Sequence, residues 1–174
     1  MKKELDLGKE KIGKLLLAFS VPCIISMIIN SIYNIVDQIF IGKGVGIIGN
    51  AATNVIFPIV IICNALAGLV GNGAAANLSL RLGEGKKDEA KKSIGSSITL
   101  LFIISILVVI IFELLLPNLV YAFGCTKNVY SSAMTYGRII VFGSFFMIVY
   151  SGLSQIIRAD GSPKYSMICL LVGA

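Results

Sequence analysis

The chain contains no histidine and few charged residues. The absence of histidine from all 174 residues excludes imidazole bases, histidine-dependent triads and histidine-ligated metal sites. Only 14% of the residues are charged, whereas 56% are hydrophobic, which is more apolar material than the core of a soluble domain needs. The cysteines are few and scattered, without a CxxC pair, so they indicate no disulfide framework. They are Cys23, Cys63, Cys125 and Cys169.

The hydrophobic residues are gathered into long blocks, and the mean hydropathy is +0.91. About 20 helical residues cross the hydrocarbon layer of a bilayer. Because unpaired backbone groups are costly in lipid, blocks of this length predict membrane-spanning helices rather than barrel strands. The predicted spans are residues 15–41, 51–78, 94–116 and 133–157, and a fifth block covers 165–174. About ten residues cannot span a bilayer, so we expect an all-α polytopic membrane protein that is truncated within its fifth helix.

The net charge of +6 is explained by the placement of the basic residues. Twelve lysines and arginines precede the first predicted span or follow the second and fourth, whereas only Lys43 and Lys127 lie in the other two loops. This asymmetry predicts that the N-terminus and the even-numbered loops are cytoplasmic. No nucleic-acid partner is needed to explain the charge. No small-residue cleavage pattern follows the N-terminal lysines, so the first span is expected to remain in the mature protein.

Polar residues recur along one face of the first span. Their spacing of three and four residues stacks the side chains of Ser26, Asn30, Tyr33, Asn34 and Asp37 on a single helical face. A carboxylate within a span costs about 2.5 to 3.5 kcal/mol on insertion scales, so it usually faces a bundle interior or an aqueous cavity. Asp37 is therefore the main functional candidate.

A carboxylate in a poorly hydrated site takes up a proton readily unless a cation or hydrogen bonds compensate its charge. Asp37 can accordingly hold a proton or Na⁺, and this change of one charge can bias two packings of the helices. Asn30, Tyr33 and Asn34 are expected to supply hydrogen bonds or neutral oxygen ligands. A second interpretation stays open, because Asp37 is four residues from Ile41, at the end of the predicted span, and would then lie in the outer headgroup region.

The other spans carry weaker signals. Asn64 faces either a cavity or an interhelical hydrogen bond, and Tyr136 faces either a cavity or the aromatic belt at the membrane surface. Pro58 is expected to bend the second span. Glu113 and Arg138 are predicted to be interfacial anchors whose charges reach water along their side-chain stems. Small residues form a ridge that predicts close helix packing in lipid. They are Ala67, Gly71 and Ala75.

The predicted connections after the first and second spans contain recognisable sequence patterns. Residues 79–93 mix glycines with a charged run and predict a solvated cytoplasmic loop between two helical hairpins. The connection after the first span contains Gly44-x-Gly46-x-x-Gly49, which matches the dinucleotide-binding fingerprint. That fingerprint binds a pyrophosphate only within a βαβ unit, and here a membrane helix enters instead of a strand. We therefore reject nucleotide binding.

Several of these elements, in this order, resemble multidrug and toxic compound extrusion (MATE) transporters. The resemblance extends over nearly the whole chain, and its most specific parts are Tyr-Asn-x-x-Asp in the first span and Arg-Ala-Asp-Gly after the fourth. The segments that carry it run over residues 30–42, 57–58, 73–83 and 157–164.

The resemblance implies two six-helix lobes, of which this chain would form most of the first. It implies a transporter in the cytoplasmic membrane of a prokaryote that expels cationic or amphiphilic compounds by alternating access, driven by Na⁺ or protons. Asp37 aligns with the acidic residue of the cation site in the DinF-like branch, and Tyr136 more loosely with a tyrosine of the same cavity. An Asn and an Asp in the fifth and sixth helices complete the family's site and lie beyond this sequence. The chain alone is therefore expected not to transport.

Three other classes compete with this one. A lipid-linked oligosaccharide flippase of the same superfamily handles an anionic lipid and needs a basic cavity, whereas the first span carries an acid. A non-transporting helical subunit would use the polar face only to join helices. An enzyme is disfavoured because the spans contain no histidine, paired carboxylates or activated serine. No cofactor is expected beyond the coupling ion.

Overall fold

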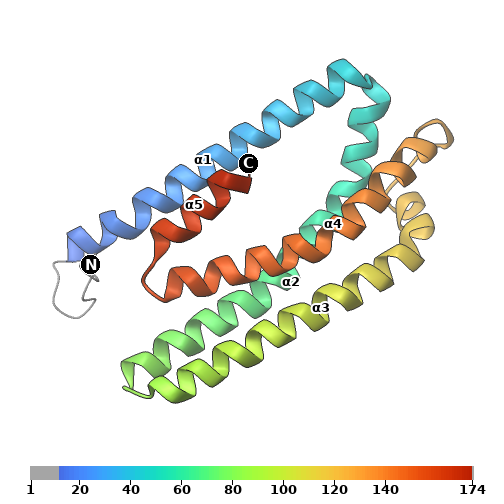
Figure 1. The fold of residues 1–174 in the computed structure, drawn as a ribbon. Coiled ribbons are helices and arrows are strands. Elements are labelled where there is room, and N and C mark those ends of the chain that lie inside the picture. The colour runs from blue at the N-terminus through green and yellow to red at the C-terminus, as the bar shows by residue number, and fades with distance from the viewer. Residues whose placement is uncertain (1–11, 174) are drawn as a thin grey trace.

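The computed structural model describes residues 12–173, which form five helices joined by short turns (Figure 1). Four of these helices are long and apolar enough to cross a membrane, which confirms the predicted all-α membrane fold. Each helix is longer than the apolar block from which it was predicted, because polar residues continue the helix at its ends. The helices are α1 (Ile12–Gly44), α2 (Ile47–Gly83), α3 (Lys87–Ala122), α4 (Lys127–Ala159) and α5 (Pro163–Gly173).

The long solvated loop predicted for residues 79–93 is wrong, because only residues 84–86 separate α2 from α3. Asp88 and Glu89 lie in the first turn of α3, where acidic side chains stabilise a helix by interacting with its dipole. Glu89 also pairs with Arg81 in the last turn of α2. The charged residues therefore extend and join two helices. The turn itself contains Gly85, which has a φ of 77°.

The apolar core is built from α2, α3 and α4. Every fully buried apolar side chain of the described residues comes from these three helices, with Ile56, Leu101 and Ile148 among the largest. Large apolar side chains elsewhere are exposed, as expected where lipid is the solvent. The core and α1 are thus distinct parts of the fold.

Small residues allow α2 and α4 to approach closely. Ala67 and Gly71 are buried and Ala75 is half-buried, as the predicted ridge requires. A Cβ atom added at Gly71 would lie 2.9 Å from the Cα and carbonyl oxygen of Gly152, so the two backbones are nearly in contact. Figure 1 shows that α2 is bent, and Pro58 lies within it.

The first helix is only partly packed. Its Cα atoms come within 8 Å of α2 and α5, and not of α3 or α4, within the described part of the chain. Figure 1 shows α5 running alongside α1. Residues 30–36 are exposed on every side of the helix. Most of the polar face of α1 therefore lies on an exposed stretch of the helix.

The two charges predicted to be interfacial anchors form an ion pair with each other. Nε of Arg138 on α4 lies 3.4 Å from Oε1 of Glu113 on α3. The antiparallel packing of α3 and α4 brings the two residues to the same height, which their separation of 25 positions in the sequence does not reveal. The pair links the two helices near their connecting turn.

Candidate functional site

The predicted polar face of α1 is present, and Asp37 lies near the C-terminal end of this helix. Asp37 is half-buried, and no hydrogen bond or ion pair engages its carboxylate within residues 12–173. Asn34 donates from Nδ2 to the Asn30 carbonyl oxygen at 2.7 Å and to its Oδ1 at 3.1 Å. Ser26 is buried and donates to the Pro22 carbonyl oxygen at 2.8 Å. These polar side chains thus bond within their own helix, while the carboxylate does not.

Tyr136 of α4 lies within electrostatic range of this carboxylate. It is half-buried, and both Asp37 and Tyr33 act electrostatically on its phenol, so the three groups lie within electrostatic range of one another. The backbones of α1 and α4 do not come within 8 Å, so only side chains approach each other.

Asn64 is not brought to this group by any contact within the described residues. Its side chain is exposed, and Nδ2 donates to the carbonyl oxygen of Val60 on the same helix at 3.1 Å. Within the described residues its amide therefore makes no interhelical hydrogen bond. Asn64 points away from the packed face of α2.

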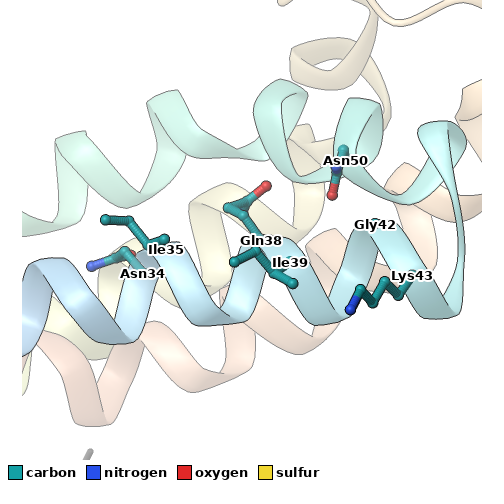
Figure 2. Close-up of a pocket in the computed structure, with 7 residues that line it drawn as sticks. All are labelled: Asn34, Ile35, Gln38, Ile39, Gly42, Lys43 and Asn50. Carbon is teal, nitrogen blue, oxygen red and sulfur yellow. The ribbon is translucent and has the colours of Figure 1, made fainter.

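An open groove lies on the neighbouring face of α1, where α1 meets α2, and sequence reasoning missed it. Its volume is about 600 Å³. Figure 2 shows Gln38 extending from α1 toward α2 and Asn50 extending back toward α1. Asp37 does not line this groove. The lining residues are Asn34, Ile35, Gln38, Ile39, Gly42, Lys43 and Asn50.

Close packing and polar contacts shape this groove. The Thr53 hydroxyl lies 2.9 Å from the Asn50 carbonyl oxygen and 3.4 Å from Oε1 of Gln38, so it connects the two helices. A Cβ atom added at Gly42 would lie 3.0 Å from Nδ2 of Asn50, so this glycine makes room for the amide. Oδ1 of Asn50 is buried and has no partner among the described residues. Gln38 follows Asn34 by four residues, and this spacing was the signal that could have identified it.

The site therefore has two chemically different surfaces. One carries Asp37, Tyr33 and Tyr136, and can hold a proton or a cation. The other is the groove of carboxamides with Lys43, which can donate and accept hydrogen bonds. No group of three or more cysteine, aspartate or glutamate side chains in the described ranges could hold a metal ion.

Comparison with known proteins agrees with this arrangement. Residues 22–174 match the family model MatE. The chain is 21% identical to the probable multidrug resistance protein YoeA of Bacillus subtilis over 95% of its length, and 29% identical to the multidrug export protein MepA of Staphylococcus aureus over 94%. It spans about a third of the length of these relatives, namely 36% of each.

A solved structure extends the comparison to three dimensions. The MATE multidrug transporter DinF-BH, solved in complex with a bound compound, superposes with a TM-score of 0.88 at 35% identity, covering 97% of this chain and 38% of that one. The family model covers most of the chain, and four of its helices are long and apolar enough to cross a membrane. The chain therefore belongs to the MatE family of membrane transporters.

Proposed function

We propose that this chain forms part of an exporter that moves cationic or amphiphilic compounds out of the cell by exchange for Na⁺ or protons. The named relatives are a multidrug export protein and a probable multidrug resistance protein, and DinF-BH was solved with a bound compound. The rest of the transporter would complete the first lobe and supply a second lobe of six helices, which makes twelve in all. Alternating access between the two lobes would then carry the substrate across.

The observation that carries the proposal is the half-buried, unpaired carboxylate of Asp37 on a membrane-length helix. An acidic side chain in such a position is costly unless it binds something, and a proton or Na⁺ removes the cost. Loading and release change the charge between α1 and α4 by one unit. A conformational equilibrium whose two states bind the cation differently responds to this change.

The proposed location is the cytoplasmic membrane of a prokaryote, with the N-terminus in the cytoplasm. The distribution of basic residues supports this orientation, because α2 ends with Arg81 and α4 ends with Arg158 at the side that we assign to the cytoplasm. The groove between α1 and α2 then opens near the outer surface. Asp37 lies within reach of the same side.

The test compares Asp37→Asn with the wild-type residue in the complete transporter, reconstituted in vesicles under imposed Na⁺ or proton gradients. Ethidium export is the measurement. We expect Asp37→Asn to lose gradient-driven export while it is expressed and folded normally, because an amide cannot exchange a proton or charge-compensate a cation. The matched control is Asp88→Asn, which removes an exposed carboxylate at the start of α3 and is expected to leave export unchanged.

The result also decides between the competing functions. Export by Asp37→Asn at the wild-type rate would contradict the proposal and favour a structural role for the polar face. A flippase for anionic lipids requires a basic cavity, whereas the polar face of α1 carries the carboxylate of Asp37. The charge of the site thus supports a cationic cargo over an anionic one.

A further inference from the structure

A second groove lies on the opposite part of the fold, between α3 and α4. Its volume is about 290 Å³, and every lining side chain is apolar. The groove is separate from the surfaces around Asp37, because α1 does not approach α3 or α4. It is lined by Ile106, Val109, Ile110, Phe142, Phe145 and Phe146.

Aromatic packing fixes the shape of this groove. The Phe145 ring is tilted against Phe102 with centroids 5.8 Å apart, and it meets Phe146 edge-on at 5.2 Å. Val109 and Phe145 are partly buried and form the floor. The walls remain open, since Ile110 is 51% exposed and Phe146 is 73% exposed. No described residue covers them.

The ion pair between Glu113 and Arg138 stands at one end of the groove. Glu113 follows Ile110 by three residues, and Arg138 precedes Phe142 by four, so both charges lie about one turn beyond the apolar lining and on its side of each helix. Glu113 contacts Nε of Arg138. The terminal nitrogens of Arg138 have no ion-pair partner within residues 12–173, and the side chain is 62% exposed. A guanidinium held in this way presents two donors that match a phosphate group.

The dimensions match one leaflet of a bilayer. Glu113 and Ile106 are seven residues apart, or about 10 Å along the axis of α3. A leaflet contributes roughly half of the ~30 Å hydrocarbon layer. The charged pair therefore lies toward the membrane surface, beside the end of α3, when the apolar groove lies within the leaflet.

We propose that this surface binds one phospholipid, with its phosphodiester on Arg138 and an acyl chain in the groove. The leaflet is the outer one if the proposed orientation is correct. Because Glu113 offsets the charge of Arg138, the phosphate is recognised through directed hydrogen bonds, and the net charge of the headgroup has little influence. The site holds lipid independently of drug or ion transport.

The test measures binding of dioleoyl phosphatidylethanolamine to the complete, delipidated transporter by native mass spectrometry. Arg138→Gln removes the phosphate contact, and Ile110→Trp fills the groove. Each variant is expected to weaken binding about tenfold, since a hydrogen bond to a charged group and a buried acyl segment each contribute at this level. Lys91→Gln is the control, because it removes one exposed positive charge from the other end of α3.

Further measurements distinguish the ligands that could bind in this groove. Dioleoylglycerol, which has the same chains without the phosphate, is expected to bind less tightly to the wild type, and inorganic phosphate is expected not to displace the phospholipid. Wild-type lipid binding by both Arg138→Gln and Ile110→Trp would overturn the proposal. So would crosslinking of a photoreactive residue at position 142 to a second copy of the protein instead of to lipid. Because Arg138 is exposed, its variant tests the site even if Ile110→Trp misfolds.

Discussion

At the scale of single residues, Gly71 determines how closely α2 packs on α4. A Cβ atom at this position would meet the backbone of Gly152, which cannot move aside as a flexible side chain can. Gly152 is itself covered by Leu101, since a Cβ atom there would lie 2.5 Å from a Leu101 methyl carbon. Three helices therefore meet at this point, and the absence of two side chains is what permits the contact.

We predict that Gly71→Ala destabilises the protein by about 1 to 3 kcal/mol, because it overpacks a close crossing. The control is Gly73→Ala, two residues further along the same helix, where a Cβ atom would meet nothing within 4 Å. That variant is expected to be neutral or to stabilise by up to about 1 kcal/mol, because alanine favours a helix over glycine. Thermal unfolding in detergent measures both. Equal unfolding temperatures for the two variants would contradict the close crossing.

The sequence predicted some residues of the site better than others. The polar face with Asp37 follows from spacing within one helix, so the periodicity of the sequence was sufficient to find it. Gln38 and Asn50 come together only because α1 turns back on α2 over two residues, and Gly42 leaves room for the amide. Such contacts depend on the geometry of the turn. The sequence pattern alone does not contain that information.

At the scale of helices, a polar cluster fixes the junction between α4 and α5. The hydroxyls of Ser154 and Ser166 lie 2.5 Å apart, and both residues are buried. Nε of Arg158 donates to the Ser166 hydroxyl at 3.0 Å. This cluster stands beside the short turn between the two helices. It holds α5 in the position from which it runs along α1.

We expect Ser166→Ala to destabilise the protein by about 1 to 3 kcal/mol, since it leaves buried polar groups of Ser154 and Arg158 without their partner. Ser31→Ala is the matched control, because Ser31 is exposed and its hydroxyl bonds only to the Met27 carbonyl oxygen of its own helix. We expect that change to stay within about 0.5 kcal/mol. Thermal unfolding monitored by circular dichroism distinguishes them. A neutral Ser166→Ala would show that the cluster does not hold the junction.

Hydropathy predicts the helices well and their ends poorly. The apolar blocks locate the four long helices because a bilayer requires about 20 apolar residues in each. The charge of residues 79–93 indicates a loop, yet most of this segment continues α2 or begins α3. A charged residue is excluded from the hydrocarbon layer but can still be part of a helix. The pairing of Glu113 with Arg138 is likewise invisible in the sequence, because it depends on how two helices pack.

At the scale of the whole molecule, the accessibility of the turn between α3 and α4 can be used to determine the orientation of the protein in the membrane. Cys125 lies in this turn, outside the helices, and desolvation raises the pKa of its thiol. The proposed orientation places this turn outside the cell and places the turn at residues 84–86 in the cytoplasm. The two turns are at opposite ends of α3.

We predict that a membrane-impermeant maleimide labels Cys125 in intact cells, and that Cys125→Ser abolishes this labelling. Because the thiolate is the reactive form and the pKa is raised, labelling should accelerate as the pH rises from neutral to mildly alkaline. Lys86→Cys, made in the Cys125→Ser background, is expected to react only after the cells are permeabilised. The reverse pattern for the two positions would show that the N-terminus lies outside.

The close crossing at Gly71 has a mechanical consequence. The buried side chains of α2, α3 and α4 form one apolar core, whereas α1 approaches only α2 and α5 within the described ranges. Helix α1, which carries Asp37, is connected to this core by the turn at Gly46, and α5 is connected to it by the turn at Gly161. A displacement of α1 relative to this core would therefore change backbone torsion angles mainly in these two turns. Because Asp37 is on α1, a movement of α1 about the turn at Gly46 would move this carboxylate relative to the core.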